Sequence, residues 1–165
     1  FSVEELAERS GVGKAAIYRR YRCREELVAA GFAAVNEDMP DVSDLPVRQA
    51  LITLLEWISN AHASGMTPTW LVGMQQIPQL RDLYMCNVVR PRRVALEAVL
   101  ERGRAQGELR EDIDIDVAMT CLSAPAIHVG MHRARGSSAG EVPIDEVVDL
   151  VLSGLLRPGA RATDS

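Results

Sequence analysis

The sequence is poor in several features that mark secreted and membrane proteins. Aromatic residues make up only 4% of its 165 residues. Its three cysteines (Cys23, Cys86 and Cys121) are an odd number, spread widely, which fits a reducing compartment better than a disulfide framework. No apolar run approaches the roughly 20 residues that a helix needs to cross a bilayer, and we identify no secretory leader. These absences predict a cytoplasmic protein without membrane contact.

Strand signals are also nearly absent, whereas apolar residues recur at helical spacing from end to end. With 47% hydrophobic residues the chain has ample material for a packed core. We therefore predict an all-α protein with an N-terminal helix-turn-helix domain (1–36), a C-terminal helical bundle (37–157) and a flexible tail (158–165).

Prolines, glycines and acidic caps divide the bundle into predicted helices. Pro91 should kink or split the long segment over 79–106, and Pro125 lies inside the helix that ends at about Arg135. Gly107 is a natural C-cap, and Asp112 or Asp114 can cap the helix that follows. The predicted segments are a linking helix over 24–36, a helix from Asp44 and Pro46 to about 64, a short piece over 70–77, a long segment over 79–106, a helix to about Arg135, and a last helix over 143–156.

The start of the chain has the pattern of a helix-turn-helix. Leu6 and Ala7 occupy the inner face of a first helix, Gly11 permits a turn at positive φ, and Val12 and Ile17 should pin a second helix across the first. Ala7 has to be small because the second helix crosses nearly on top of it. Each residue type meets a steric demand of the motif.

The charge distribution supports nucleic-acid binding at this end. Six basic residues and no acidic one lie between Arg9 and Arg24, although the chain carries a net charge of −5. Residues 36–165 hold 12 basic and 18 acidic residues, so the positive charge is local. Such a patch is typical of phosphate contact. The alternative is a solvated helical face in a bundle that does not bind DNA.

These residues resemble the DNA-binding segment of the tetracycline-repressor (TetR) family of transcriptional regulators. Members normally carry a further helix before the position of Phe1, and we expect that the printed sequence starts after it. The resemblance is specific over 1–32 and looser beyond. It is carried by Phe1-Ser2-Val3, Leu6-Ala7, Ser10-Gly11-Val12, Ile17-Tyr18-Arg19-Arg20-Tyr21 and Arg24-Glu25-Glu26-Leu27, and later by Arg90-Pro91-Arg92-Arg93, the 103–109 segment and the 148–155 segment.

The resemblance implies a homodimeric, ligand-responsive repressor whose recognition helix (about 13–18) enters the major groove of double-stranded operator DNA. The residues expected near bases and phosphates are Gly13, Lys14, Ala15, Ala16 and Arg19. Those expected to hold the DNA backbone are Ser2, Tyr18, Arg20 and Arg24. The alternative class is a helical ligand-binding or adaptor protein that does not bind DNA.

The second domain has large and polarizable side chains on several predicted helices, which is typical of an adaptable apolar cavity. We expect a small, mostly apolar effector to bind there. For each residue alone, plain core packing is the alternative. The predicted wall consists of Trp57, Trp70, Met74, Met85, Cys86, Met119, Cys121 and His128.

The last two helices are the predicted dimer interface. From Ile144 to Leu156 eight of 13 residues are apolar, a wider arc than one packing face uses. Pairing with the helix around 119–131 would give a four-helix bundle across a two-fold axis. The alternative is a last helix wrapped fully by its own domain.

The sequence indicates neither a cofactor nor catalysis. His128 and His132 share a helical face, but spacing supplies no third ligand, so we predict no metal site. No nucleophile–base arrangement, phosphate-binding loop or activated carboxylate pair stands out, and we expect no enzymatic activity.

Overall fold

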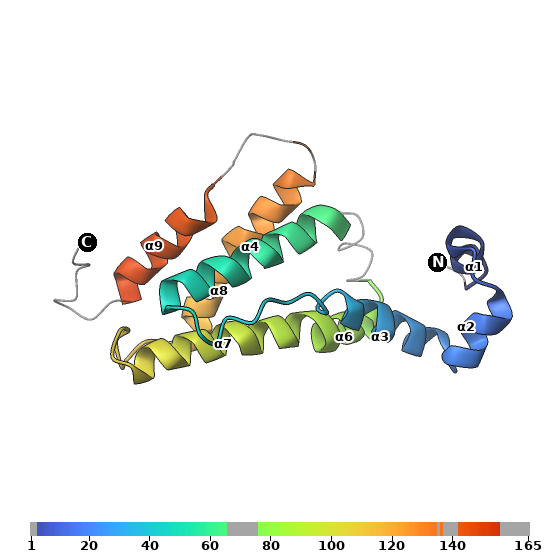
Figure 1. Ribbon diagram of the computed structural model, residues 1–165, viewed down its shortest axis with the longest axis horizontal. Helices are drawn as coiled ribbons and strands as arrows, with labels where there is room; N and C mark the ends of the chain where they lie inside the picture. The colour runs from blue at the N-terminus through green and yellow to red at the C-terminus, as the bar shows by residue number, and fades with distance from the viewer. Residues whose placement is uncertain (1–2, 66–75, 135, 137–141, 156–165) are drawn as a thin grey trace.

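The structure, a computed structural model, describes residues 3–65, 76–134, 136 and 142–155. These residues form helices and no strand, which confirms the all-α prediction (Figure 1). No helix among them is both long and apolar enough to span a membrane. The elements are α1 (Val3–Ser10), α2 (Lys14–Arg20), α3 (Arg24–Ala34), α4 (Val47–Gly65), α6 (Pro78–Tyr84), the π-helical turn η1 (Met85–Val89), α7 (Arg90–Ala105), α8 (Ile115–Arg133) and α9 (Ile144–Leu155).

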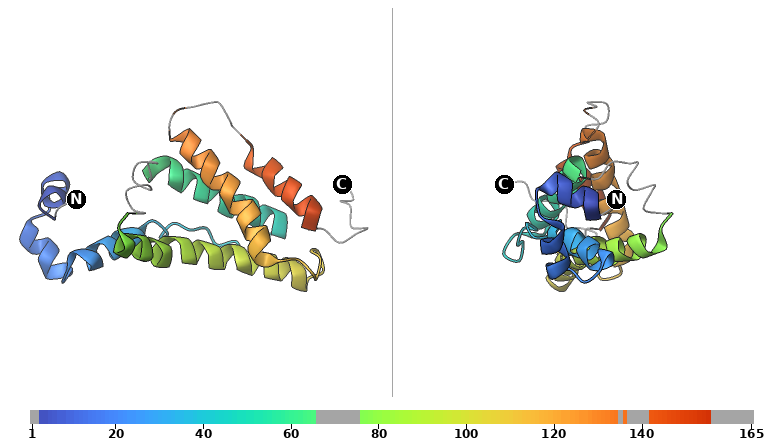
Figure 2. Two further views of the ribbon diagram at one scale, coloured as in Figure 1. Left: turned by 180° about the vertical axis from the view of Figure 1, so that it is seen from behind. Right: turned by 90° about the vertical axis from the view of Figure 1, so that its right-hand side faces the viewer.

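Helices α1 and α2 form the helix-turn-helix, at one end of an elongated molecule (Figures 1 and 2). Gly11 has φ +68° in the turn between them, as the pattern predicts. Ile17 is buried against α1, whereas Val12 is 45% exposed. The predicted pinning role of Val12 is therefore wrong, because Val12 lies in the turn and not on the face of α2 that meets α1.

The core of the bundle lies between α4, α7, α8 and α9 (Figure 2). Its centre is a set of fully buried aliphatic side chains on these helices and on the α7–α8 connection, among them Leu51, Leu55, Leu100, Leu109, Leu122 and Val148. The α7–α8 connection follows the sequence prediction. Gly107, just beyond the end of α7, has φ +74°, and the Asp114 side chain accepts a hydrogen bond from the Val117 N–H, so Asp114 is the cap of α8.

Helices α4 and α8 are in close contact at Gly130. A Cβ built there would lie 2.7 Å from the Cβ of His62 and would also collide with the carbonyl of Ser59. Any side chain at this position would therefore push the two helices apart. Gly130 is needed for its size, and not for an unusual backbone angle.

The segment around Pro91 is divided, as predicted, but by a π-helical turn. Because proline has no N–H, it cannot donate to the carbonyl of Asn87 one turn earlier. The side-chain amide of Asn36 takes this role: its Nδ2 donates to the Asn87 oxygen at 2.9 Å and to the Val88 oxygen at 3.2 Å. A residue just beyond the linking helix is thus held by the break in the long segment.

Apolar contacts accompany these hydrogen bonds. Phe32 of α3 meets Tyr84 edge to face, with ring centroids 5.7 Å apart, and both pack with Val88 in a small second cluster. Figure 1 shows α3 running beside α6 at this point. The linking helix therefore connects the helix-turn-helix to the bundle through α6 and η1.

We expect Gly130→Ala to lower the free energy of unfolding by about 1–3 kcal/mol, because the added methyl group overpacks the α4–α8 contact. Urea unfolding followed by circular dichroism would measure this. Gly31→Ala on α3 is the matched control, since its Cβ would meet no atom within 4 Å. It should be neutral or stabilise by up to about 1 kcal/mol. Equal stability of the two variants would contradict the packing described here.

Candidate functional site

Helix α2 presents a basic, solvent-exposed face. Lys14, Tyr18, Arg19 and Arg20 are exposed, and Tyr18 is 51% accessible although it is aromatic. Gly13 and Ala15 are exposed too, Ala16 is half-buried, and Arg24 begins α3 on the surface. Ser2 lies outside the described residues. The structure thus brings most of the predicted DNA-binding residues to one end of the molecule and leaves them accessible.

One predicted contact residue is already engaged. The ammonium of Lys14 forms an ion pair with the carboxylate of Glu4 on α1. Hydrogen bonding to Lys14 lowers the pKa of Glu4, and the reciprocal bond raises the pKa of Lys14. Both side chains are more than half exposed, so a phosphate can compete for the lysine.

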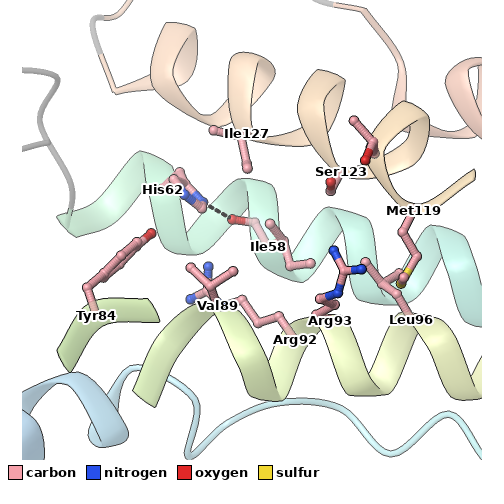
Figure 3. Close-up of a pocket in the computed structure, with 11 residues that line it drawn as sticks. Ile58, His62, Tyr84, Val89, Arg92, Arg93, Leu96, Met119, Ser123 and Ile127 are labelled. Atoms are coloured by element: carbon pink, nitrogen blue, oxygen red, sulfur yellow. Dashed lines mark hydrogen bonds between the residues drawn. The ribbon is translucent and has the colours of Figure 1, made fainter. Parts of the chain in front are cut away.

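A pocket of about 110 Å³ lies between α4, α8 and the α6–η1–α7 segment (Figure 3). Arg93 and Thr120, which are exposed, stand at its mouth, and Arg93 pairs there with Asp116. Its walls are mostly apolar. The lining residues are Ile58, His62, Tyr84, Val89, Arg92, Arg93, Leu96, Met119, Thr120, Ser123 and Ile127.

Two of the lining residues are polar and nearly inaccessible, Arg92 (6% exposed) and His62 (2%). The Arg92 guanidinium carbon lies 4.8 Å from the ring centroid of Trp57, and its Nε donates to the Asn36 Oδ1 at 2.9 Å. His62 Nδ1 lies 2.8 Å from the Ile58 carbonyl oxygen. Because a carbonyl only accepts, Nδ1 carries the proton.

Burial lowers the pKa of His62 from its ordinary value of 6.5, and the positive charge of Arg92 lowers it further, against the bond to Ile58. The imidazole is therefore neutral at pH 7. Desolvation likewise lowers the pKa of Arg92, but a guanidinium stays protonated in proteins. The pocket thus combines an apolar wall, a neutral imidazole and one buried positive charge.

Comparison with known proteins identifies the family to which this architecture belongs. A family model described as "Tetracyclin repressor-like, C-terminal domain" matches residues 45–151, and one described as "Bacterial regulatory proteins, tetR family" matches residues 1–30. The chain belongs to the tetR family of bacterial regulatory proteins. It is therefore a DNA-binding transcriptional regulator by family.

The individual relatives that follow have low sequence identity to this chain. The chain is 28% identical over 131 residues to the uncharacterised HTH-type transcriptional regulator YdeS of Bacillus subtilis, covering 77% of this chain and 66% of that protein. It is 26% identical over 166 residues to the DNA-binding transcriptional repressor TetR of Mycobacteroides abscessus, covering 98% of this chain and 86% of the relative. The crystal structure of the transcriptional regulator FadR from Bacillus subtilis in complex with stearoyl-CoA aligns with a TM-score of 0.62 at 16% identity, over 94% of this chain and 87% of that one. This last likeness shows a shared fold.

The pocket of this TetR-family chain differs from the predicted wall. Met119 does line it, and Trp57 packs against the core beneath Arg92. Trp70 and Met74 lie outside the described residues. Four predicted wall residues are exposed and do not line the pocket, because they lie on the outer faces of η1 and α8: Met85, Cys86, Cys121 and His128.

Sequence reasoning missed the two buried polar residues. The signal was present, since His62 continues the apolar stripe of Leu51, Leu55 and Ile58 at helical spacing. Arg92 similarly lies four residues before Leu96. A charged or titratable residue in a core position is the feature to look for.

The histidines of α8 stack without a metal-binding set. The His128 and His132 rings have centroids 4.4 Å apart. In the described part of the chain no three histidine, cysteine or carboxylate side chains gather closely enough to hold an ion.

We expect protonation of His62 to destabilise the folded chain. Its pKa is lower folded than unfolded, so the unfolded state binds more protons below pH 6.5 and stability falls as the pH drops through that value. Urea unfolding at pH 7.5, 6.5 and 5.5 should give a shallower pH dependence for His62→Gln, by up to about 1.4 kcal/mol per pH unit. The exposed His128→Gln should match the wild type. Identical slopes for all three proteins would rule out a buried neutral imidazole.

Proposed function

We propose that the chain acts in the bacterial cytoplasm as a homodimeric repressor that a small apolar effector releases from operator DNA. The observation that carries the proposal is the exposed basic face of α2 on a projecting helix-turn-helix, joined to a bundle with a largely apolar pocket. The structural neighbour FadR was crystallised with stearoyl-CoA, which supports a ligand-responsive role for this fold.

In this proposal α2 enters the major groove. Lys14, Ala15 and Arg19 lie close to bases and phosphates, while Tyr18, Arg20 and Arg24 hold the backbone. Gly13, Ala16 and Ser2 complete the predicted set; the half-buried Ala16 allows close approach without a bulky side chain. Since Lys14 is paired with Glu4 in the free protein, DNA binding exchanges a carboxylate for a phosphate at this lysine.

The dimer is proposed to form through α8 and α9. Three apolar or small side chains, and then a histidine, follow the exposed face of α8 at spacings of four, three and four residues: Val117, Cys121, Ala124 and His128. On α9 the inner face is buried, whereas Leu150 is 75% exposed. A two-fold contact would cover both exposed faces and set the distance between the two recognition helices.

Release requires that the effector bind one arrangement of the dimer better than the other. Moving the population from 99:1 to 1:99 takes about 5.5 kcal/mol of differential binding. The proposed route runs from the pocket through η1 to α3, because the pocket residue Arg92 contacts Asn36 and because Phe32 packs on Tyr84. A small shift of α3 is amplified at α2, which lies at the far end of the molecule (Figure 1).

We expect Lys14→Ala to weaken duplex binding and to lower the slope of log affinity against log salt by about 0.9, the loss of one phosphate contact. Glu4→Gln should strengthen binding, because it frees the lysine. A duplex selected from genomic DNA and fluorescence anisotropy at several salt concentrations would measure both effects. The control is Glu8→Gln, which removes an exposed α1 carboxylate and should have the smaller effect. A wild-type chain without salt-sensitive duplex binding would favour a helical ligand-binding or adaptor protein instead.

We expect Leu150→Glu to convert the dimer into a monomer at micromolar concentration, because it buries a charge in the proposed α8–α9 interface. Sedimentation velocity would measure the change. Val94→Glu is the matched control, since Val94 is an exposed apolar residue (55%) on α7, away from that interface. A monomeric wild type, or a Leu150→Glu variant that remains dimeric, would contradict the interface.

A further inference from the structure

The Arg92 guanidinium is a buried positive charge without a counter-ion in the described part of the chain. Arg92 is 6% exposed and lines the pocket, and none of the ion pairs among the described residues involves it. Its Nη2 is buried with no hydrogen-bond partner among those residues. Leaving a charged donor unsatisfied in the interior is costly, so native structures rarely keep one without a use.

Among the described residues, the other charged and titratable groups near Arg92 do not supply a counter-charge. His62 and Tyr84 are the titratable groups that interact electrostatically with it, and both are neutral at pH 7, since burial lowers the pKa of His62 and raises the pKa of Tyr84. The neighbouring Arg93 has its own partner, Asp116, at the pocket mouth. The positive charge of Arg92 therefore acts on whatever occupies the pocket.

We propose that the ligand of this pocket is a compact apolar molecule that ends in a carboxylate, and that this carboxylate binds Arg92. The proposal rests on the proposed function and names the chemical class of its effector. Ile58, Leu96 and Met119 would cover the hydrocarbon part. An apolar cavity of about 150 Å³ holds one benzene molecule. The pocket of about 110 Å³ is smaller than that but opens at Arg93, so it suits a straight chain that can extend through the mouth better than a ring.

The same carboxylate would act on the linking segment. Nε and Nη2 lie on one edge of the planar guanidinium, the edge that a carboxylate occupies with two parallel hydrogen bonds. In the free protein the Asn36 Oδ1 already accepts from Nε at 2.9 Å. A carboxylate that binds Nη2 and Nε therefore competes with the Asn36 oxygen. Displacing Asn36 weakens its two hydrogen bonds to η1, and these bonds link the bundle to α3.

The test compares octanoate with 1-octanol by isothermal titration calorimetry on the full chain at pH 7.5. The wild type should bind octanoate about tenfold to hundredfold more tightly, the worth of hydrogen bonds to a charged group. Arg92→Gln should abolish this preference, and Arg92→Lys, which keeps the charge without the fork, should retain only part of it. The control variant Arg90→Gln, exposed on the same helix, should keep the preference, and Arg93→Gln, at the pocket mouth, tests whether the carboxylate binds there instead.

The coupling is tested with Asn36→Ala and the duplex selected for the wild type. Octanoate should weaken duplex binding by the wild type at least tenfold. Asn36→Ala should still bind octanoate within about threefold of the wild type but show no such weakening, a separation that a general loss of stability would not produce.

Two results would overturn the proposal: wild-type protein that binds octanoate no more tightly than octanol, or a preference removed by Arg93→Gln and not by Arg92→Gln. Either can occur in a protein that binds duplex DNA normally, which would leave the proposed repressor function intact. Loss of salt-sensitive duplex binding by the wild type would instead count against the proposed function, whatever the calorimetry shows.

Discussion

The side chain of Asn36 joins the DNA-binding end of the molecule to the bundle. Pro91 cannot donate to the carbonyl of Asn87, and the amide of Asn36 does so in its place, while its oxygen accepts from the buried Arg92. Helix α3 also packs on α6 and η1, where Phe32 meets Tyr84 edge to face. Because the hydrogen bonds of Asn36 connect this junction directly to the pocket residue Arg92, a change in the pocket can reach α3, whereas the close-packed α4–α8 core resists deformation.

The buried residues that line the pocket are apolar, like those of the core, except His62 and Arg92. His62 continues an apolar stripe, and its neutral ring donates through Nδ1–H to the Ile58 carbonyl in the preceding turn. Arg92 cannot become neutral, and stacking on Trp57 offsets only part of its desolvation. The bundle therefore keeps one charge in a position where an aliphatic residue would be more stable, which is the usual sign of a functional site.

The helix-turn-helix is also restrained in the free protein. The Lys14–Glu4 pair holds α2 to α1 and neutralises one of the charges that would meet phosphate. This pair weakens non-specific attraction to DNA without removing it, since both groups remain exposed and the other basic residues of α2 are unaffected. In the proposed dimer, specific binding depends on two such helices placed together, so the dimer geometry would decide whether this modest surface suffices.

What the sequence by itself determined is local. The turn at Gly11, the helix end at Gly107, a cap at Asp112 or Asp114, the break near Pro91 and the basic patch of α2 depend on residues within a turn or two of each other and were predicted. The structure selects Asp114 as the cap. Most of the pocket wall was not predicted, Met119 excepted, because it requires knowing which faces of three helices meet. The π-helical turn adds a residue before α7 and so rotates its face, which leaves Met85 and Cys86 outside and Arg92 within. Only the tertiary packing of α7 against α4 and α8 decided that rotation.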